Sequence, residues 1–262
     1  MSSSTPEQVP AGPPGGSGGP RRSSLPRLLV LVSVLTVLLA AAVAIPAYLV
    51  NRNHTALAAQ QARVSGIPAS VSTSLSNLMV LNPLPGDRAP GFTLTDQDGH
   101  TLSLSSLRGK VVVLQFMDPH CTDICPIVSA EFVKAYQDLG PLASKVVFAA
   151  VNVNAYHARV QDMAKYTRAQ QLNTIPSWHF LTGPVPALKS VWRGYHIQVY
   201  AANANADVQH TSAVYFIDPQ GRERYLASPE ADHTKSGASY LPASQQIAWG
   251  HGIALVARQL AS

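Results

Sequence analysis

The sequence is poor in cysteine: Cys121 and Cys125 are the only two in 262 residues. Both lie in the stretch MDPHCTDICPIV, residues 117–128. No cysteine comes directly after the apolar segment near the N-terminus, which argues against a lipoprotein anchor. Two thiols at this spacing form a structural disulfide, a redox pair or part of a metal site, and the other residues must distinguish these uses.

Charged residues are also scarce, at 13% of the chain. Before residue 84 there are five arginines and a single acidic residue, Glu7. From residue 84 onward, 14 Lys and Arg residues nearly balance 13 Asp and Glu residues. Of the net charge of +5, +4 therefore belongs to the N-terminal region. This balance argues against a basic face for phosphates, and we expect no nucleic-acid partner.

The N-terminal region predicts a tail followed by a membrane anchor. Residues 1–20 contain five Pro and five Gly, so we expect a disordered cytoplasmic tail over 1–27. Residues 28–50 carry no charge over 23 positions, roughly 35 Å of helix and enough to span a bilayer. Because Arg21, Arg22 and Arg27 precede this segment, the positive-inside rule places the N-terminus in the cytoplasm.

The same reasoning places everything after residue 50 outside the cytoplasm. A cleaved signal peptide is the alternative, since ALA at 56–58 resembles a cleavage site, but the apolar run is longer than a typical signal core. RRSSL at 21–25 matches a twin-arginine signal only in part. The Pro- and Gly-rich start is unlike an Arg-rich transit peptide, which favours a single-pass protein of a bacterial plasma membrane over a mitochondrial one.

Residues 51–83 read as a linker, rich in small residues and interrupted by prolines, that lets a domain reach a neighbour. Residues 84–262 predict one α/β domain with a mixed sheet, because strands and helices alternate and the series ends in a hairpin and a helix. Hairpins are expected around QDG at 97–99 and DPQG at 218–221. Buried strands are expected at 110–117 and 145–153, with helices at 127–140, 158–172, 185–195 and 244–260.

The two cysteines come directly after the first buried strand and open a helix, with Pro126 in its first turn. We therefore expect Cys125 at a helix N-terminus, where the free amides favour a thiolate. A loop-borne Cys121 can approach it, so a disulfide is possible but not dictated. Two thiolates aimed at one point suit Cu(I).

Two cysteines are an incomplete set for many metals, so a third ligand is needed. Among nine histidines, His210 stands just before a buried strand, as Cys121 stands just after one. If those strands are neighbours in the sheet, His210 meets the thiols at the same end. His120, next to Cys121, is expected to point away from the partner thiol.

A family resemblance joins these residues. GDRAPGFTLTDQDG followed by LRGKVVVLQF resembles the opening of thioredoxin-like proteins. HCTDICP resembles the C-x-x-x-C-P motif of the Sco/SenC copper proteins, with Thr122 in place of the usual Pro. QHTSAVYFIDPQG resembles that family's second motif, with Gln209 in place of Asp.

The resemblance implies a thioredoxin-like fold, a central mixed sheet flanked by helices, with Cys121, Cys125 and His210 as ligands of Cu(I) or Cu(II). It also implies a metallochaperone that helps to assemble the binuclear copper centre of cytochrome c oxidase. Its partners would be the copper-acceptor subunit of the oxidase or other copper chaperones. Asn152 and Asn154 stand where the family usually has acidic residues after the second buried strand, a departure that bears on the surroundings of the site and on partner choice.

Three other readings compete. A membrane-tethered thiol–disulfide oxidoreductase would use Cys121 and Cys125 as a redox pair, but such enzymes typically have C-x-x-C and a later Thr-Pro. TDIC resembles the T-x-x-C of peroxiredoxins, yet the expected Pro is displaced by one position to Pro119. A structural disulfide is the third. Met117 and Asp118 are interpreted as the end of a core strand and a loop-shaping residue rather than auxiliary ligands.

Overall fold

The computed structural model describes residues 38, 41–42, 44–46, 48–49 and 66–262. The chain divides into two units, Met1–Thr55 and Ala56–Ser262, and each is described by itself. Within the first unit, the described residues between 38 and 49 have helical backbone. The predicted membrane segment at 28–50 lies largely outside the described residues. Among those that are described, no helix combines the length and the apolar character needed to cross a membrane.

The second unit is built on one mixed sheet of six strands, in the order β1-β10-β9-β4-β5-β6. Strands β4, β5 and β6 run parallel, whereas β9 is antiparallel to β4, β10 to β9 and β1 to β10. Their bounds are β1 (Asn82–Pro83), β4 (Val111–Met117), β5 (Val146–Asn152), β6 (Trp178–Leu181), β9 (Val214–Ile217) and β10 (Glu223–Ala227). The predicted mixed sheet and the hairpin at DPQG are confirmed.

Strand β4 is central because both of its faces are covered. All seven of its residues are buried, as its β-branched apolar sequence predicts. Val113 and Met117 belong to one core cluster, together with residues of the helices on that face. Leu114 and Phe116 alternate onto the other face, where they share a second cluster with Trp192.

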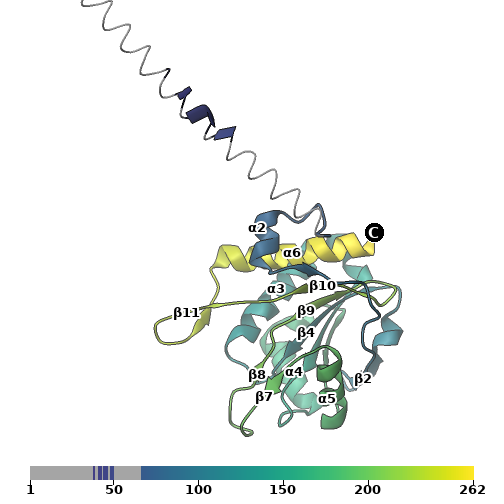
Figure 1. The fold of residues 1–262 in the computed structure, drawn as a ribbon. Helices are drawn as coiled ribbons and strands as arrows, with labels where there is room; N and C mark the ends of the chain where they lie inside the picture. Colours follow the sequence, from purple (N-terminus) through teal and green to yellow (C-terminus); the bar gives the residue numbers. More distant parts are fainter. Residues whose placement is uncertain (1–37, 39–40, 43, 47, 50–65) are drawn as a thin grey trace, which may run out of the picture. The chain divides into compact units, whose positions relative to one another are not determined.

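Helices cover the two faces unequally. Helices α3 (Ile124–Leu139), α4 (Val160–Ala169) and α6 (Ala243–Ala261) contribute to the first cluster, and α5 (Val185–Gly194) contributes to the second. Figure 1 shows α6 lying along α3 at the top of the domain. Gly250 permits this close approach, since a Cβ there would lie 2.9 Å from the carbonyl oxygen of Glu131.

The start of the domain differs from the sequence-based expectation. Residues 66–83 were expected to be linker, but Met79 and Leu81 are buried in the first core cluster. Helix α2 (Thr73–Leu78) lies against α6 (Figure 1), and β1 pairs with β10. Small residues and prolines conceal this packing in the sequence, because a few buried apolar side chains suffice to attach the segment.

Small hairpins complete the fold. The predicted hairpin at QDG is β2 (Thr93–Thr95) and β3 (Thr101–Ser103), followed by the short 3-10 helix η1 (Leu104–Leu107). Two further pairs lie on the later part of the chain: β7 (Val199–Tyr200) with β8 (Gln209–His210), and β11 (Asp232–His233) with β12 (Ser239–Tyr240). The 3-10 helices η2 (Gly140–Lys145) and η3 (Leu172–Thr174) connect the larger elements.

Candidate metal centre

The loop after β4 is organised by Asp118, which is buried. Its Oδ1 accepts a hydrogen bond from the backbone N–H of His120 at 2.8 Å, and its carbonyl oxygen accepts one from the N–H of Cys121 at 3.1 Å. These bonds close a tight turn that starts where the strand ends. The interpretation of Asp118 as a loop-shaping residue is confirmed. Met117 is fully buried in the core, also as expected.

The turn brings the two cysteines into contact. Cys125 is the second residue of α3, 2% exposed, and its backbone N–H lies 3.4 Å from the Sγ atom of Cys121. Both cysteines are free thiols, and Cys121 is the more accessible of the two. The predicted position of Cys125 at a helix start is confirmed.

The helix start is expected to favour a thiolate at Cys125, but the pKa shifts within the pair favour one at Cys121 instead. Hydrogen bonding from the Cys125 side chain lowers the pKa of Cys121 to about 7, and the backbone N–H groups of Cys125 and Asp123 lower it further against the effect of burial. The same side-chain contact and burial raise the pKa of Cys125 well above its ordinary value. The helix start does stabilise a thiolate, but its amide points at the preceding cysteine.

His210 reaches the same end of the sheet through the strand pairing. Strand β9 is antiparallel to β4, with Val214 paired to Gln115, so the residues before β9 lie near the carboxyl end of β4. His210 ends β8, and its Nδ1 atom lies 3.0 Å from the carbonyl oxygen of Thr211. Since a carbonyl only accepts, Nδ1 donates and Nε2 keeps a free lone pair. Burial lowers the pKa of His210, which favours the neutral ring that a metal requires.

Cys121 and His210 line a common cavity of about 780 Å³. Asp118, Asp123 and Asp207 also line it, and the turn between β11 and β12 forms part of its wall. The N–H of Ser239 donates to Oδ1 of Asp123 at 3.2 Å, which attaches that wall to the start of α3. The cavity has an acidic lining on the side of the more accessible thiol.

The predicted ligand set is only partly assembled. Among the described residues, two groups of three His, Cys, Asp or Glu side chains have ligand atoms within 4.8 Å of one another, and the set of Cys121, Cys125 and His210 is not one of them. The cysteines touch, while His210 shares the cavity with Cys121. The donor types nevertheless fit copper: two thiols for Cu(I), and an imidazole with a free Nε2 that also suits Cu(II).

Two asparagines near the site were not predicted to have a role. Asn154 Nδ2 donates to Oδ1 of Asp118 at 3.0 Å, which joins the segment after β5 to the turn after β4. Asn152 Nδ2 donates to the carbonyl oxygens of Asn154 and His157 and contacts Thr182 Oγ1. The parallel pairing of the two buried strands was the available signal, because it brings the segments that follow them together.

Comparison with known proteins identifies a family and several relatives. The sequence profile of the SCO1/SenC family matches residues 84–239. The SCO1 protein homolog of Bacillus subtilis is 28% identical over 149 residues, 55% of this chain and 74% of that protein. A chloroplastic peroxiredoxin Q of Populus jackii is 36% identical over 95 residues, 33% of this chain and 45% of that protein.

A solved structure, that of copper-bound ScoI of Bradyrhizobium japonicum, has a TM-score of 0.51 at 20% identity. The match covers 66% of this chain and 99% of that one, and it shows the fold. The fold and the free cysteine pair after the first buried strand define a thioredoxin-like domain. Because the family profile covers more than half of the sequence, the chain belongs to the SCO1/SenC family.

Proposed function

We propose that this chain is a copper-binding chaperone that delivers copper to the binuclear centre of cytochrome c oxidase. The observation that carries the proposal is the contact between two free thiols beside a cavity that His210 also lines. The copper-bound Bradyrhizobium relative has the same fold. Copper is the cargo, so a site at a cavity suits its function.

The order in which the cysteines release copper follows from how accessible each one is. Cys121 lines the cavity and its lowered pKa favours the thiolate, so it serves as the first ligand of Cu(I) and the first to be displaced by an acceptor's thiolate. Cys125 is buried and has a raised pKa, so it must lose its proton when copper binds. Oxidation of the pair to a disulfide abolishes binding and couples copper loading to redox state.

We place this activity outside the cytoplasm, at a bacterial plasma membrane. The uncharged segment 28–50 and the arginines before it support an anchor with a cytoplasmic N-terminus. A reporter enzyme that is active only outside the cytoplasm, fused after residue 65, is expected to be active. A fusion that is active only inside would contradict this orientation.

Copper titration of the full-length reduced chain tests the ligands. One Cu(I) per chain is expected, with binding lost in Cys121→Ala and Cys125→Ala and Cu(II) binding weakened in His210→Ala. His251→Ala is the control, since His251 pairs with Asp138 on the surface of α6 and α3. Unchanged Cu(I) affinity in either cysteine variant overturns the thiol site, and unchanged Cu(II) affinity in His210→Ala overturns the third ligand.

A thiol–disulfide oxidoreductase is the second candidate, and the lowered pKa of Cys121 favours it. The Cys121 thiolate would attack a partner's disulfide, and Cys125 would then resolve the mixed disulfide, so that the pair loses two electrons and the partner gains two thiols. Turnover with a disulfide substrate and a thiol reductant, in the absence of copper binding, favours this candidate. Consumption of hydrogen peroxide by Cys121 would instead favour the peroxiredoxin-like reading.

A further inference from the structure

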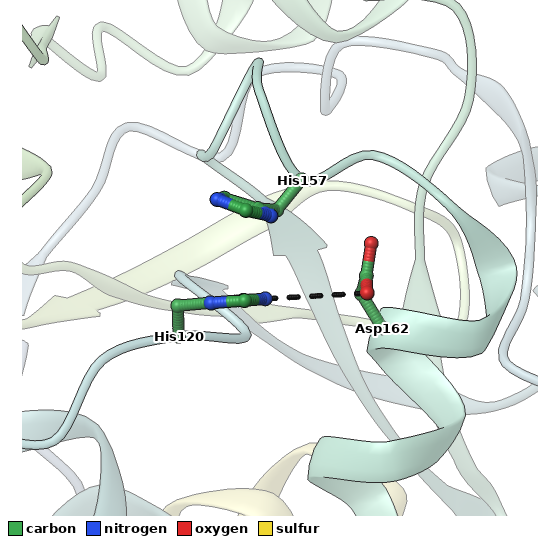
Figure 2. Close-up of side chains that lie close together, drawn as sticks. All are labelled: His120, His157 and Asp162. Carbon is green, nitrogen blue, oxygen red and sulfur yellow. Dashed lines mark ion pairs between the residues drawn. The ribbon is translucent and has the colours of Figure 1, made fainter. Parts of the chain in front are cut away.

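A second group of ligand-type side chains lies beside the cysteines. His120, His157 and Asp162 each place a ligand atom within 4.8 Å of those of the other two. Figure 2 shows the His120 and His157 rings stacked, with centroids 3.8 Å apart, and His120 Nε2 directed at Asp162 Oδ1 at 4.0 Å. The residues come from three places in the chain: the turn after β4, the segment after β5, and the first turn of α4.

The sheet explains why these residues meet. Strands β4 and β5 are parallel, with Met117 paired to Asn152, so both following segments leave the same end of the sheet. Asn154 then joins them, because its Nδ2 donates to Asp118 while its Oδ1 accepts the backbone N–H of His157 at 3.2 Å. The backbone of His120 is attached to Asp118 by its own N–H. The backbone of each histidine is thus held by its own hydrogen bond.

The His157 ring has the arrangement expected of a metal ligand. Its Nε2 atom lies 3.0 Å from the carbonyl oxygen of Ala204, in the loop between β7 and β8. Since the carbonyl only accepts, Nε2 carries the proton and Nδ1 keeps a free lone pair. Histidines that bind metals usually donate their other ring N–H to a carbonyl or carboxylate in this way. This bond is independent of the spacing of the three residues.

Asp162 supplies the negative charge. Its side chain is only 11% exposed. Its cationic contact is the largely exposed Arg159, which donates from Nε to Oδ2 at 3.3 Å and from Nη2 to Oδ1 at 3.4 Å. Because the Arg159 side chain is 75% exposed, it can turn into solvent and leave the carboxylate to a bound cation. A bound divalent cation compensates the carboxylate and accepts both imidazole lone pairs.

We propose that His120, His157 and Asp162 form a second metal site, for a divalent late first-row ion of the Zn²⁺ or Cu²⁺ type. Imidazole and carboxylate donors select such ions, whereas the thiols of Cys121 and Cys125 select Cu(I). Tetrahedral ligands at about 2.0–2.2 Å from a metal have donor atoms about 3.3–3.6 Å apart. Binding therefore draws the three groups closer and turns the rings out of their stack, which the half-exposed His120 side chain permits.

The proposal stands apart from copper delivery, since it concerns other side chains and is tested with another metal ion. Zn²⁺ is the probe, because it is not reduced by thiols. Titration of the full-length Cys121→Ser/Cys125→Ser chain is expected to show one bound Zn²⁺, with Cu²⁺ displacing it as the stronger binder. Loss of Zn²⁺ binding there leaves the Cu(I) titration of the wild type unaffected, so the two proposals fail separately.

The ligand variants locate the site. In the cysteine-free chain, His157→Ala and Asp162→Asn are each expected to weaken Zn²⁺ binding by about 10- to 100-fold or more, since losing even an outer-shell partner costs that much. The control is His251→Ala, which removes a His–Asp pair, 3.2 Å apart, that is not part of either three-ligand group.

Two results overturn the proposal: no Zn²⁺ bound by the folded cysteine-free chain, or unchanged affinity in both ligand variants. If removing the buried Cys125 prevents folding, the count is made on the wild-type chain instead. There, His157→Ala is expected to reduce the number of Zn²⁺ ions bound per chain by one. An unchanged count contradicts the site.

Discussion

Replacing Cys125 with Ala tests which cysteine is the thiolate and why. The side chain of Cys125 is the largest contributor to the lowered pKa of Cys121, which is about 7 against an ordinary value of 9.0. Ala removes that S–H donor but keeps the backbone N–H that lies 3.4 Å from Sγ of Cys121. The pKa of Cys121 is therefore expected to rise toward 9.0 without quite reaching it.

The size of the effect follows from the thiolate fraction and its reactivity. At pH 7 a thiol with a pKa of about 7 is roughly half ionised, and one with a pKa of about 9 roughly 1% ionised. The more basic thiolate is intrinsically faster by roughly 6- to 10-fold for two pKa units, because nucleophilicity follows basicity with a slope of about 0.4–0.5. The variant should react roughly fivefold to eightfold more slowly at pH 7 and faster than the wild type above about pH 9.

The assay is the pH dependence of Cys121 alkylation by iodoacetamide, followed by mass spectrometry of the Cys121 peptide. Cys125→Ser is the matched control, since its hydroxyl keeps a donor and should hold the midpoint closer to 7. A midpoint that stays near 7 in Cys125→Ala would refute the reasoning. The amides at the start of α3 would then account for the whole shift.

Three further perturbations address the fold around the site. Burial raises the pKa of Glu131 to about 8, so the native state holds a proton that the unfolded chain releases above about pH 4.5. The free energy of unfolding should therefore fall as pH rises from about 4.5 to 8, by up to a few kcal/mol at about 1.4 kcal/mol per pKa unit. Glu131→Gln should remove that fall, as measured by urea unfolding at about pH 5 and pH 8. Parallel pH profiles would contradict it. Gly250→Ala should lower the free energy of unfolding by about 1–3 kcal/mol in the same assay, because its Cβ would lie 2.9 Å from the carbonyl oxygen of Glu131. Gly91→Ala is the control and should cost far less, since its Cβ would have nothing within 4 Å. Equal losses of stability in the two variants would argue against close packing of α6 on α3. Asn154→Ala should cost roughly 1–3 kcal/mol by leaving the buried Asp118 short of a donor, and a change below about 0.5 kcal/mol would show that water replaces it.

The elements that the sequence predicts well are those whose pattern is decided locally. The apolar β-branched run of β4, the DPQG turn between β9 and β10, and the helix opened by Pro126 all follow from neighbouring residues. The two-residue strands β7, β8, β11 and β12 could not be predicted, because their pairing is decided by contacts between distant parts of the chain. Burial of Met79 against α6 has the same origin.

The site divides in the same way. The position of Cys125 follows from the strand-to-helix pattern, and the approach of His210 required one assumption about strand neighbours, which the β4–β9 pairing meets. The identity of the thiolate did not follow, because it depends on the direction of a single N–H group. His157 and Asp162 lack any local signature, since only the parallel pairing of β4 and β5 brings them to His120.

Asn154 stands where the family usually has an acidic residue, and its neighbours explain the difference. An acidic residue there would place a second carboxylate where the Asn154 amide now lies, 3.0 Å from Oδ1 of the buried Asp118, with two like charges in a poorly solvated place. The amide instead donates to Asp118 and accepts from the backbone of Tyr156 and His157 with its other end. One side chain thereby holds the turn that carries Cys121 and the segment that carries His157.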